Sequence, residues 1–129
     1  MPKILTVEDE AAIAELVRRK LVGAGHVVIH ARSGPKALEI AVSEVPDLIL
    51  MDINLGVFSP EGWEVNRLLK ADASTASIPV IALTAHAQQV EHRERALREG
   101  FVEHISKPID FGLLLKTVAD VLNTSEGQR

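Results

Sequence analysis

The chain of 129 residues contains no cysteine and no tyrosine, and it has a single tryptophan. Without cysteine there is no disulfide framework and no thiolate chemistry. No apolar stretch approaches the roughly 20 residues of a membrane-spanning helix, and residues 1–3 lead into a strand pattern rather than a signal peptide. The formal net charge of −4 argues against a nucleic-acid surface, which normally carries a basic patch. We therefore expect a cytoplasmic protein that binds neither nucleic acid nor membrane.

Aliphatic side chains recur along the chain in two alternating patterns. Short apolar runs typical of buried strands are separated by longer stretches with apolar residues at helical spacing. The expected strands are 3–7, 27–29, 47–51, 78–83 and 101–105, and the expected helices are 10–23, 35–43, 61–71, 88–98 and 110–122. This alternation predicts an α/β fold with a parallel sheet.

The buried stripe of two helices can be assigned from this spacing. The helix over 10–23 is expected to bury Ile13, Leu16, Val17 and Leu21, and the helix over 110–122 to bury Phe111, Leu114, Leu115, Val118 and Leu122. The length fits one compact domain. We expect that domain to cover residues 1–123, with a flexible tail over 124–129.

Polar residues stand where the expected strands end. They are Glu8, Asp9 and Glu10 after the first strand, Asp52 after the third, Thr84 after the fourth, and Ser106, Lys107 and Pro108 after the fifth. Right-handed crossovers bring the carboxyl ends of parallel strands to one edge of the sheet, where ligands bind in open α/β folds. We therefore expect these groups to converge on one pocket.

The residue types in this pocket indicate a metal-assisted phosphoryl chemistry. Carboxylates held together repel one another unless a cation is present. Oxygen ligands without histidine or cysteine suit a hard divalent ion, magnesium before zinc. A carboxylate can also attack phosphorus to form an aspartyl phosphate, and such transfer needs cationic and hydroxyl donors near the phosphoryl oxygens. Lys107 and Thr84 are chemically suited to that task.

Four segments resemble the response-regulator receiver family. They are Ile-Leu-Thr-Val-Glu-Asp-Glu at 4–10, Leu-Ile-Leu-Met-Asp at 48–52, Ile-Ala-Leu-Thr-Ala at 81–85 and Ser-Lys-Pro at 106–108. They follow the family's order and spacing over almost the whole chain, and together they are highly specific. The resemblance implies a flavodoxin-like receiver fold, a doubly wound, five-stranded parallel sheet of order 2-1-3-4-5 flanked by five helices.

The resemblance also implies a function in two-component signalling. Asp52 would accept a phosphoryl group from a sensor histidine kinase or a histidine phosphotransfer protein, and it would also be one of the Mg²⁺ ligands. The chain would be a switch rather than an enzyme, although it would assist its own phosphorylation and dephosphorylation. No output domain is expected after the last helix, as in the stand-alone chemotaxis and cell-cycle receivers. The signal would then pass to a separate effector protein from a monomer or weak dimer.

By the same resemblance, further residues take roles around Asp52. Asp9 would bind Mg²⁺ directly, Glu8 would bind it through water, and the backbone carbonyl of Asn54 would be a further ligand. Thr84 would hydrogen-bond the phosphoryl group and Lys107 would pair with it.

The resemblance assigns the switch to a second group of residues. Ala85 is small and leaves room for a phosphodonor, and the bond before Pro108 is expected to be cis. The output surface would be formed by 88–98, 101–105 and 110–122. Leu113 is a candidate contact on it, with core packing as the equal alternative.

The sequence departs from the commonest family pattern at three places. Glu8 stands where an aspartate is usual, and it keeps the charge. The loop over 53–62 reaches its glycine about two residues later than usual, which could affect kinase docking or phosphoryl lifetime, or could be structural drift. His104 replaces an aromatic residue; we interpret it as a solvent-facing strand residue, with an imidazole that takes over the packing role and makes the switch pH-sensitive as the alternative.

Each of these residues also has an ordinary structural explanation. The acids at 8–10 could cap a helix, and Asp52 could form a turn. Their joint fit to one mechanism favours the receiver. Two rivals stay open: a binding module of the same fold that is never phosphorylated, and an α/β enzyme or flavin carrier. The acidic run after the first strand argues against a flavin phosphate cradle.

Overall fold

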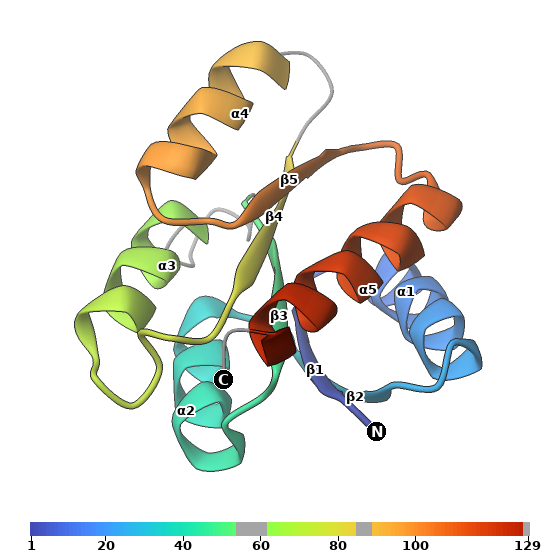
Figure 1. Cartoon of the computed structure of the whole chain (residues 1–129), viewed down its shortest axis with the longest axis horizontal. Helices are drawn as coiled ribbons and strands as arrows, with labels where there is room; N and C mark the ends of the chain where they lie inside the picture. The colour runs from blue at the N-terminus through green and yellow to red at the C-terminus, as the bar shows by residue number, and fades with distance from the viewer. Residues whose placement is uncertain (54–61, 85–88, 128–129) are drawn as a thin grey trace.

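The computed structural model describes residues 1–53, 62–84 and 89–127, in which strands and helices alternate strictly (Figure 1). The elements are β1 (Lys3–Val7), α1 (Ala11–Gly23), β2 (Val27–Ala31), α2 (Gly34–Glu44), β3 (Leu48–Asp52), α3 (Gly62–Ala71), β4 (Val80–Thr84), α4 (Gln89–Arg98), β5 (Glu103–Ser106) and α5 (Phe111–Gly127). None of the helices in these ranges is both long enough and apolar enough to cross a membrane.

All strand pairs are parallel, and the sheet has the order β2-β1-β3-β4-β5. The expected doubly wound fold is therefore confirmed. Helices α1 and α5 cover one face of the sheet, and α2, α3 and α4 cover the other (Figure 1). Every residue of the central strands β3 and β4 is buried, as expected for parallel strands covered on both faces.

Alternation along β3 divides the core into two apolar layers. Leu48 and Leu50 belong to the cluster that contains the buried side chains of α1 and α5. Ile49 and Met51 belong to the cluster that contains those of α2 and α3. Successive strand residues point to opposite faces, so an unbroken apolar run serves both layers. A polar residue of such a strand can then approach water only at the strand end.

Local signals explain where several helices begin and end. The Ser33 hydroxyl accepts a hydrogen bond from the backbone N–H of Lys36 at 3.4 Å and caps α2, which has a proline in its first turn. Gly25 and Gly100 follow α1 and α4 with φ angles of 95° and 94°. These left-handed conformations are open to glycine at little cost, so both helices end where the sequence supplies one.

Two expectations about the helices differ from the structure. Leu16 was expected on the buried stripe of α1, yet it is 44% exposed. The buried residues of this helix are Ala14, Val17 and Leu21, and Leu16 lies to one side of that stripe. Helix α5 runs to Gly127 rather than ending at Leu122. The division at residue 123 between a domain and a flexible tail stays a prediction.

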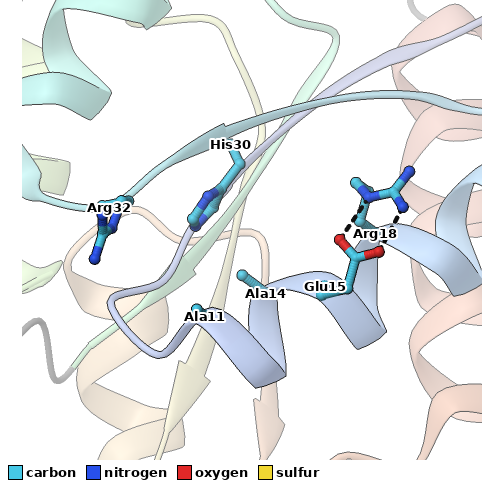
Figure 2. Close-up of a pocket in the computed structure, with 6 residues that line it drawn as sticks. All are labelled: Ala11, Ala14, Glu15, Arg18, His30 and Arg32. Carbon is cyan, nitrogen blue, oxygen red and sulfur yellow. Dashed lines mark hydrogen bonds and ion pairs between the residues drawn. The ribbon is translucent and has the colours of Figure 1, made fainter.

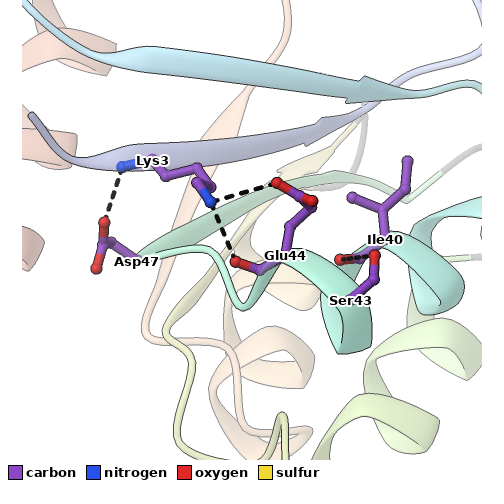
Figure 3. A network of polar contacts seen from close by, with 5 residues as sticks. All are labelled: Lys3, Ile40, Ser43, Glu44 and Asp47. Carbon is purple, nitrogen blue, oxygen red and sulfur yellow. Dashed lines mark hydrogen bonds and ion pairs between the residues drawn. The ribbon is translucent and has the colours of Figure 1, made fainter.

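A polar network ties α2 to the beginning of the sheet (Figure 3). The backbone N–H of Lys3 donates to Asp47 Oδ2 at 2.8 Å, and the N–H of Asp47 donates to the Lys3 carbonyl at 2.7 Å. Lys3 Nζ also bonds the Glu44 carbonyl and carboxylate, both at 3.3 Å. The Lys3–Glu44 ion pair is exposed and adds little stability. The backbone bonds matter more, because they set the start of β3 against β1.

Val45 ends α2 in a left-handed conformation, with φ of 43°. A β-branched residue is strained there, and this side chain is 57% exposed, so little burial compensates. We predict that Val45→Gly raises the free energy of unfolding by about 1 kcal/mol, after allowance for the added flexibility of the unfolded chain. Urea denaturation of both proteins measures the change.

Val42 provides the matched control, because it is 49% exposed and lies within α2. Val42→Gly should destabilise the protein, since glycine is a poor residue inside a helix. Equal losses in the two variants would contradict the assignment of strain to Val45.

Gly62 begins α3 in close contact with the end of β3. Its N–H donates to the Ile53 carbonyl at 2.9 Å. A Cβ atom at this position would lie 2.6 Å from the Asp52 carbonyl oxygen and 2.8 Å from Ile53 Cα. Both neighbours are backbone atoms that cannot move aside cheaply. We predict that Gly62→Ala lowers the free energy of unfolding by about 1–3 kcal/mol, measured by urea denaturation.

Gly23 offers the same substitution in an open place. A Cβ atom there meets nothing within 4 Å. Gly23→Ala should be neutral or stabilise the protein by up to about 1 kcal/mol through its better helix propensity. A Gly62→Ala variant as stable as Gly23→Ala would refute the close approach of α3 to β3.

Candidate functional site

Carboxylates from two neighbouring strands meet at the carboxyl edge of the sheet. Val7 of β1 lies opposite Met51 of β3, so the residues that follow them share this edge. Glu8, Asp9 and Asp52 each offer an oxygen atom within 4.8 Å of the others. Glu8 and Asp52 are buried, with 3% and 1% of their surface exposed, whereas Asp9 is exposed. The predicted convergence of these acids is therefore found in the structure.

Lys107 extends into this acidic cluster from the end of β5. Its Nζ lies 2.8 Å from Asp52 Oδ2 and 3.7 Å from Glu8 Oε2. Burial by itself lowers the pKa of Lys107, but the bond to Asp52 and the charges of Asp52, Glu8 and Glu10 outweigh it, so the pKa is raised. The amine therefore stays protonated and offsets part of the negative charge.

The backbone around Lys107 is held against β4. The Lys107 N–H donates to the Thr84 carbonyl at 2.8 Å. The peptide bond between Lys107 and Pro108 is cis, as the sequence predicted. The ends of β4 and β5 are thus joined beside the acidic cluster.

Glu8 is the carboxylate most disturbed by this arrangement. Burial, followed by the carboxyl group of Asp52, raises the pKa of Glu8 to about 8. The N–H of Glu10 donates to Glu8 Oε1 at 3.1 Å, and this bond and the Lys107 charge act in the opposite direction. Glu8 Oε2 is buried and accepts no hydrogen bond from the described residues.

A buried carboxylate oxygen without a hydrogen bond calls for an explanation, and a cation is one. Each ligand atom that Glu8, Asp9 and Asp52 could offer to a metal is a carboxylate oxygen. Such ligands suit a hard divalent cation. The residues present therefore fit a magnesium ion.

Thr84 and His104 form a second feature of the site. Thr84 ends β4 and is fully buried, and its Oγ1 lies 2.5 Å from Nε2 of His104 on β5. His104 is half-buried, with its ring against Thr84. It is therefore not the solvent-facing residue that we expected. No sequence motif predicts this bond, because it joins side chains of two different strands.

His30 is a neighbour of the site that the sequence analysis missed. Its Nε2 lies 2.8 Å from the carbonyl oxygen of Glu8. The ring also lines a pocket between the first half of α1 and the end of β2 (Figure 2). The other residues around this pocket are Ala11, Ala14, Glu15, Arg18 and Arg32. A lone histidine on an edge strand carries no motif, so only the folded arrangement reveals its contact.

Two of the predicted switch residues, His104 and Pro108, line a shallow pocket between α4, β5 and α5. It is lined by Arg93, His104, Ile105, Ser106, Pro108, Asp110 and Leu113. Leu113 is 51% exposed, as expected for a candidate contact. The predicted metal ligand Asn54, the small residue Ala85 and most of the longer loop lie outside the described residues.

Comparisons with known proteins agree with this geometry. A model of the response regulator receiver domain family matches residues 4–119. The polar-differentiation response regulator DivK of Brucella anthropi is 40% identical over 124 residues, which cover 95% of this chain and 98% of the relative.

Solved structures show the same fold. The chemotaxis protein CheY4 of Vibrio cholerae has a TM-score of 0.84 and 28% identity, and the match covers 94% of this chain and 98% of that one. A response regulator receiver domain from Clostridium thermocellum has a TM-score of 0.88 and 25% identity over 100% of both chains. Since the family match spans nearly all of the fold and includes every strand end of the acidic cluster, the chain belongs to the response regulator receiver domain family of two-component signalling.

Proposed function

We propose that the chain is a phosphorylation-controlled switch in which Asp52 accepts a phosphoryl group. The donor would be a phosphohistidine on a sensor kinase or on a histidine phosphotransfer protein. One observation carries the proposal: Asp52 is buried, yet its Oδ2 lies 2.8 Å from Lys107 Nζ inside a cluster of acids. A buried carboxylate held by an ammonium group at a ligand-binding edge is placed for chemistry rather than for packing.

The proposed step is an in-line transfer. The Asp52 carboxylate attacks phosphorus, an oxygen–phosphorus bond forms, and the phosphorus–nitrogen bond to the donor imidazole breaks. Lys107 is placed to pair with a phosphoryl oxygen after the transfer, because it already contacts Asp52. Thr84, at the end of the neighbouring strand, supplies a hydroxyl group that can donate to another oxygen.

Glu8, Asp9 and Asp52 would hold the Mg²⁺ ion, with the backbone carbonyl of Asn54 as a further ligand. The bound ion would neutralise the carboxylates and the charge on the phosphoryl oxygens. The Oε2 atom of Glu8, which accepts no hydrogen bond from the described residues, supports this assignment.

The proposed output surface consists of α4, β5 and α5. Leu97 of α4 and Leu113 of α5 are 50% and 51% exposed, and Val102, directly before β5, is 44% exposed. Exposed apolar side chains beside a charged helix suit a contact with an effector protein. We place this exchange in the cytoplasm, where a monomer or weak dimer would meet kinase and effector in turn.

Incubation with a small-molecule phosphodonor tests the chemistry directly. We expect intact mass spectrometry to show a gain of one phosphoryl group when Mg²⁺ is present and almost none when it is chelated. The reason is that the crowded carboxylates repel an anionic donor without a cation.

Asp52→Asn is the control for this measurement, because it keeps the shape of the side chain and removes the nucleophile. Its mass should not change. A folded wild-type protein that gains no mass, even with a phosphorylated kinase as donor, would instead favour the binding module that is never phosphorylated.

The pKa of Glu8 gives a prediction for the metal-free protein. Because this pKa is raised to about 8, the folded state favours the neutral form, and that advantage is lost as pH rises from about 4.5 through about 8. Glu8→Gln keeps a neutral side chain at every pH. We expect the two proteins to melt alike near pH 5, and the variant to gain several degrees over wild type by about pH 9.

Saturating Mg²⁺ should reduce this difference, because the cation stabilises the ionised carboxylate of the wild type. Glu10→Gln serves as the control, because it removes an exposed acid of the same segment and leaves the Glu8 carboxyl group in place. Melting curves that stay parallel across the range for wild type and Glu8→Gln would contradict the raised pKa.

A further inference from the structure

Strand β2 holds the backbone of Glu8 at two points, although none of the clustered acids lies on that strand. Strand β1 ends at Val7, and Glu8 follows it. The Glu8 N–H donates to the carbonyl of Ala31 at 3.1 Å, which extends the pairing of β1 with β2 by one residue. The Glu8 carbonyl oxygen lies 2.8 Å from Nε2 of His30. Both hydrogen-bonding groups of the Glu8 backbone are therefore bonded to β2.

The bond between His30 and Glu8 determines which ring nitrogen carries a proton. A carbonyl oxygen can only accept a hydrogen bond, so Nε2 of His30 must be the donor. His30 lies opposite Thr6 in the ladder between β1 and β2, and its ring points toward the turn that leads into α1 (Figure 2). Ala11 and Ala14 of that helix line the same pocket as the ring. Because both side chains are small, the imidazole has room beside the start of α1 to contact the Glu8 carbonyl.

The position of Asp9 depends on the residues on either side of it. The N–H and carbonyl of Asp9 have no hydrogen bond to the described residues, and its side chain is exposed. On one side, the carbonyl of Glu10 accepts the N–H of Ala14 at 3.0 Å, which joins Glu10 to α1. On the other side, Asp9 follows Glu8 and its two bonds to β2. The two consecutive acids of the metal group thus share the anchor at Glu8.

Repulsion among the acids acts against this anchor. Glu8, Asp9 and Asp52 offer oxygen atoms within 4.8 Å of one another. Lys107 Nζ lies 2.8 Å from Asp52 Oδ2 but 3.7 Å from Glu8 Oε2, so its charge compensates Asp52 more than Glu8. Without a further cation, carboxylates at this spacing push the residues after β1 away from Asp52. The hydrogen bonds from β2 oppose that movement.

We propose that His30 is a positioning residue for the metal site, whose Nε2–H holds the Glu8 carbonyl and so keeps the Glu8 and Asp9 carboxylates beside Asp52 in the metal-free protein. This inference rests on the proposed function, because it concerns the Mg²⁺ ion that would assist phosphorylation. Groups that orient metal ligands raise the affinity for the metal, since binding then requires less ordering of the ligands. His30 acts here through the backbone of a ligand and is not a ligand itself.

Thermal unfolding at increasing Mg²⁺ measures this affinity, because an ion that binds only the folded state stabilises it by mass action. The pH and the ionic strength are held constant, and each protein is compared with its own metal-free melting temperature. We expect the Kd for Mg²⁺ of His30→Leu to exceed that of wild type by about three- to tenfold, the effect of losing roughly one hydrogen bond. His30→Gln carries an amide donor of similar reach, and its Kd should lie within about twofold of wild type.

His26→Leu is the matched control. His26 lies directly before β2, at the end of that strand away from the acids, and its replacement should leave the Kd unchanged. A purely structural role of either histidine would lower the metal-free melting temperature without changing the Kd. Equal Kd values for wild type and His30→Leu would overturn the inference. So would equal increases in His30→Leu and His26→Leu, or a His30→Gln protein that binds Mg²⁺ as weakly as His30→Leu.

A measurement on the unaltered histidine does not depend on how well the variants fold. At a pH at which the ring is neutral, we expect ¹⁵N NMR of the wild type to show a proton on Nε2 of His30 and none on Nδ1. A ring protonated on Nδ1 alone would overturn the inference, because a bare Nε2 cannot donate to a carbonyl oxygen.

The same melting curves separate this inference from the proposed function. A wild-type protein that Mg²⁺ does not stabilise at any concentration would refute the metal site of the proposed function itself. A wild type that binds Mg²⁺, but no more tightly than His30→Leu does, would refute only the role of His30.

Discussion

The ion pair between Lys107 and Asp52 is the interaction on which the site depends. Two buried carboxylates, Glu8 and Asp52, lie beside the exposed Asp9 within 4.8 Å of one another, and Lys107 is the cation that contacts both buried ones. A buried charge is costly unless it is paired, so this amine makes the cluster tolerable. One ammonium does not balance three carboxylates, and burial, followed by the carboxyl group of Asp52, raises the pKa of Glu8 to about 8. The folded chain is thus strained in the direction that a divalent cation relieves.

The fold can hold this charge because β3 is apolar on both faces until its last residue. Leu48 to Met51 serve the two core layers in alternation, and Asp52 follows where the layers end. The neighbouring strands end at the same edge because the pairing register aligns them, and their local sequences do not determine this alignment. Burial of the strand therefore fixes the position of Asp52, and the stability of the core offsets the cost of the acid cluster.

Much of this could be predicted from the sequence, because periodicity and strand order decide where Glu8, Asp52, Thr84 and Lys107 lie. The burial of Leu16 was predicted wrongly, because helical spacing shows which face of a helix is buried but not how wide that face is. The bond between Thr84 and His104 could not be predicted. It depends on the Ala82–His104 register and on the reach of an imidazole ring along the strand, and neither leaves a pattern in the sequence.

The two sides of Asp52 differ in how firmly they are coupled to it. On one side, Gly62 packs so closely on the Asp52 carbonyl that a Cβ would lie 2.6 Å from it, and this contact sets the start of α3 whatever the length of the preceding loop. On the other side, Thr84 is linked to His104 by a single hydrogen bond between side chains. A hydrogen bond between two side chains contributes about 1 kcal/mol, and a charged acceptor forms a stronger one. The two sides of Asp52 therefore differ in kind: α3 is held by close packing of backbone atoms, and Thr84 by a bond between side chains.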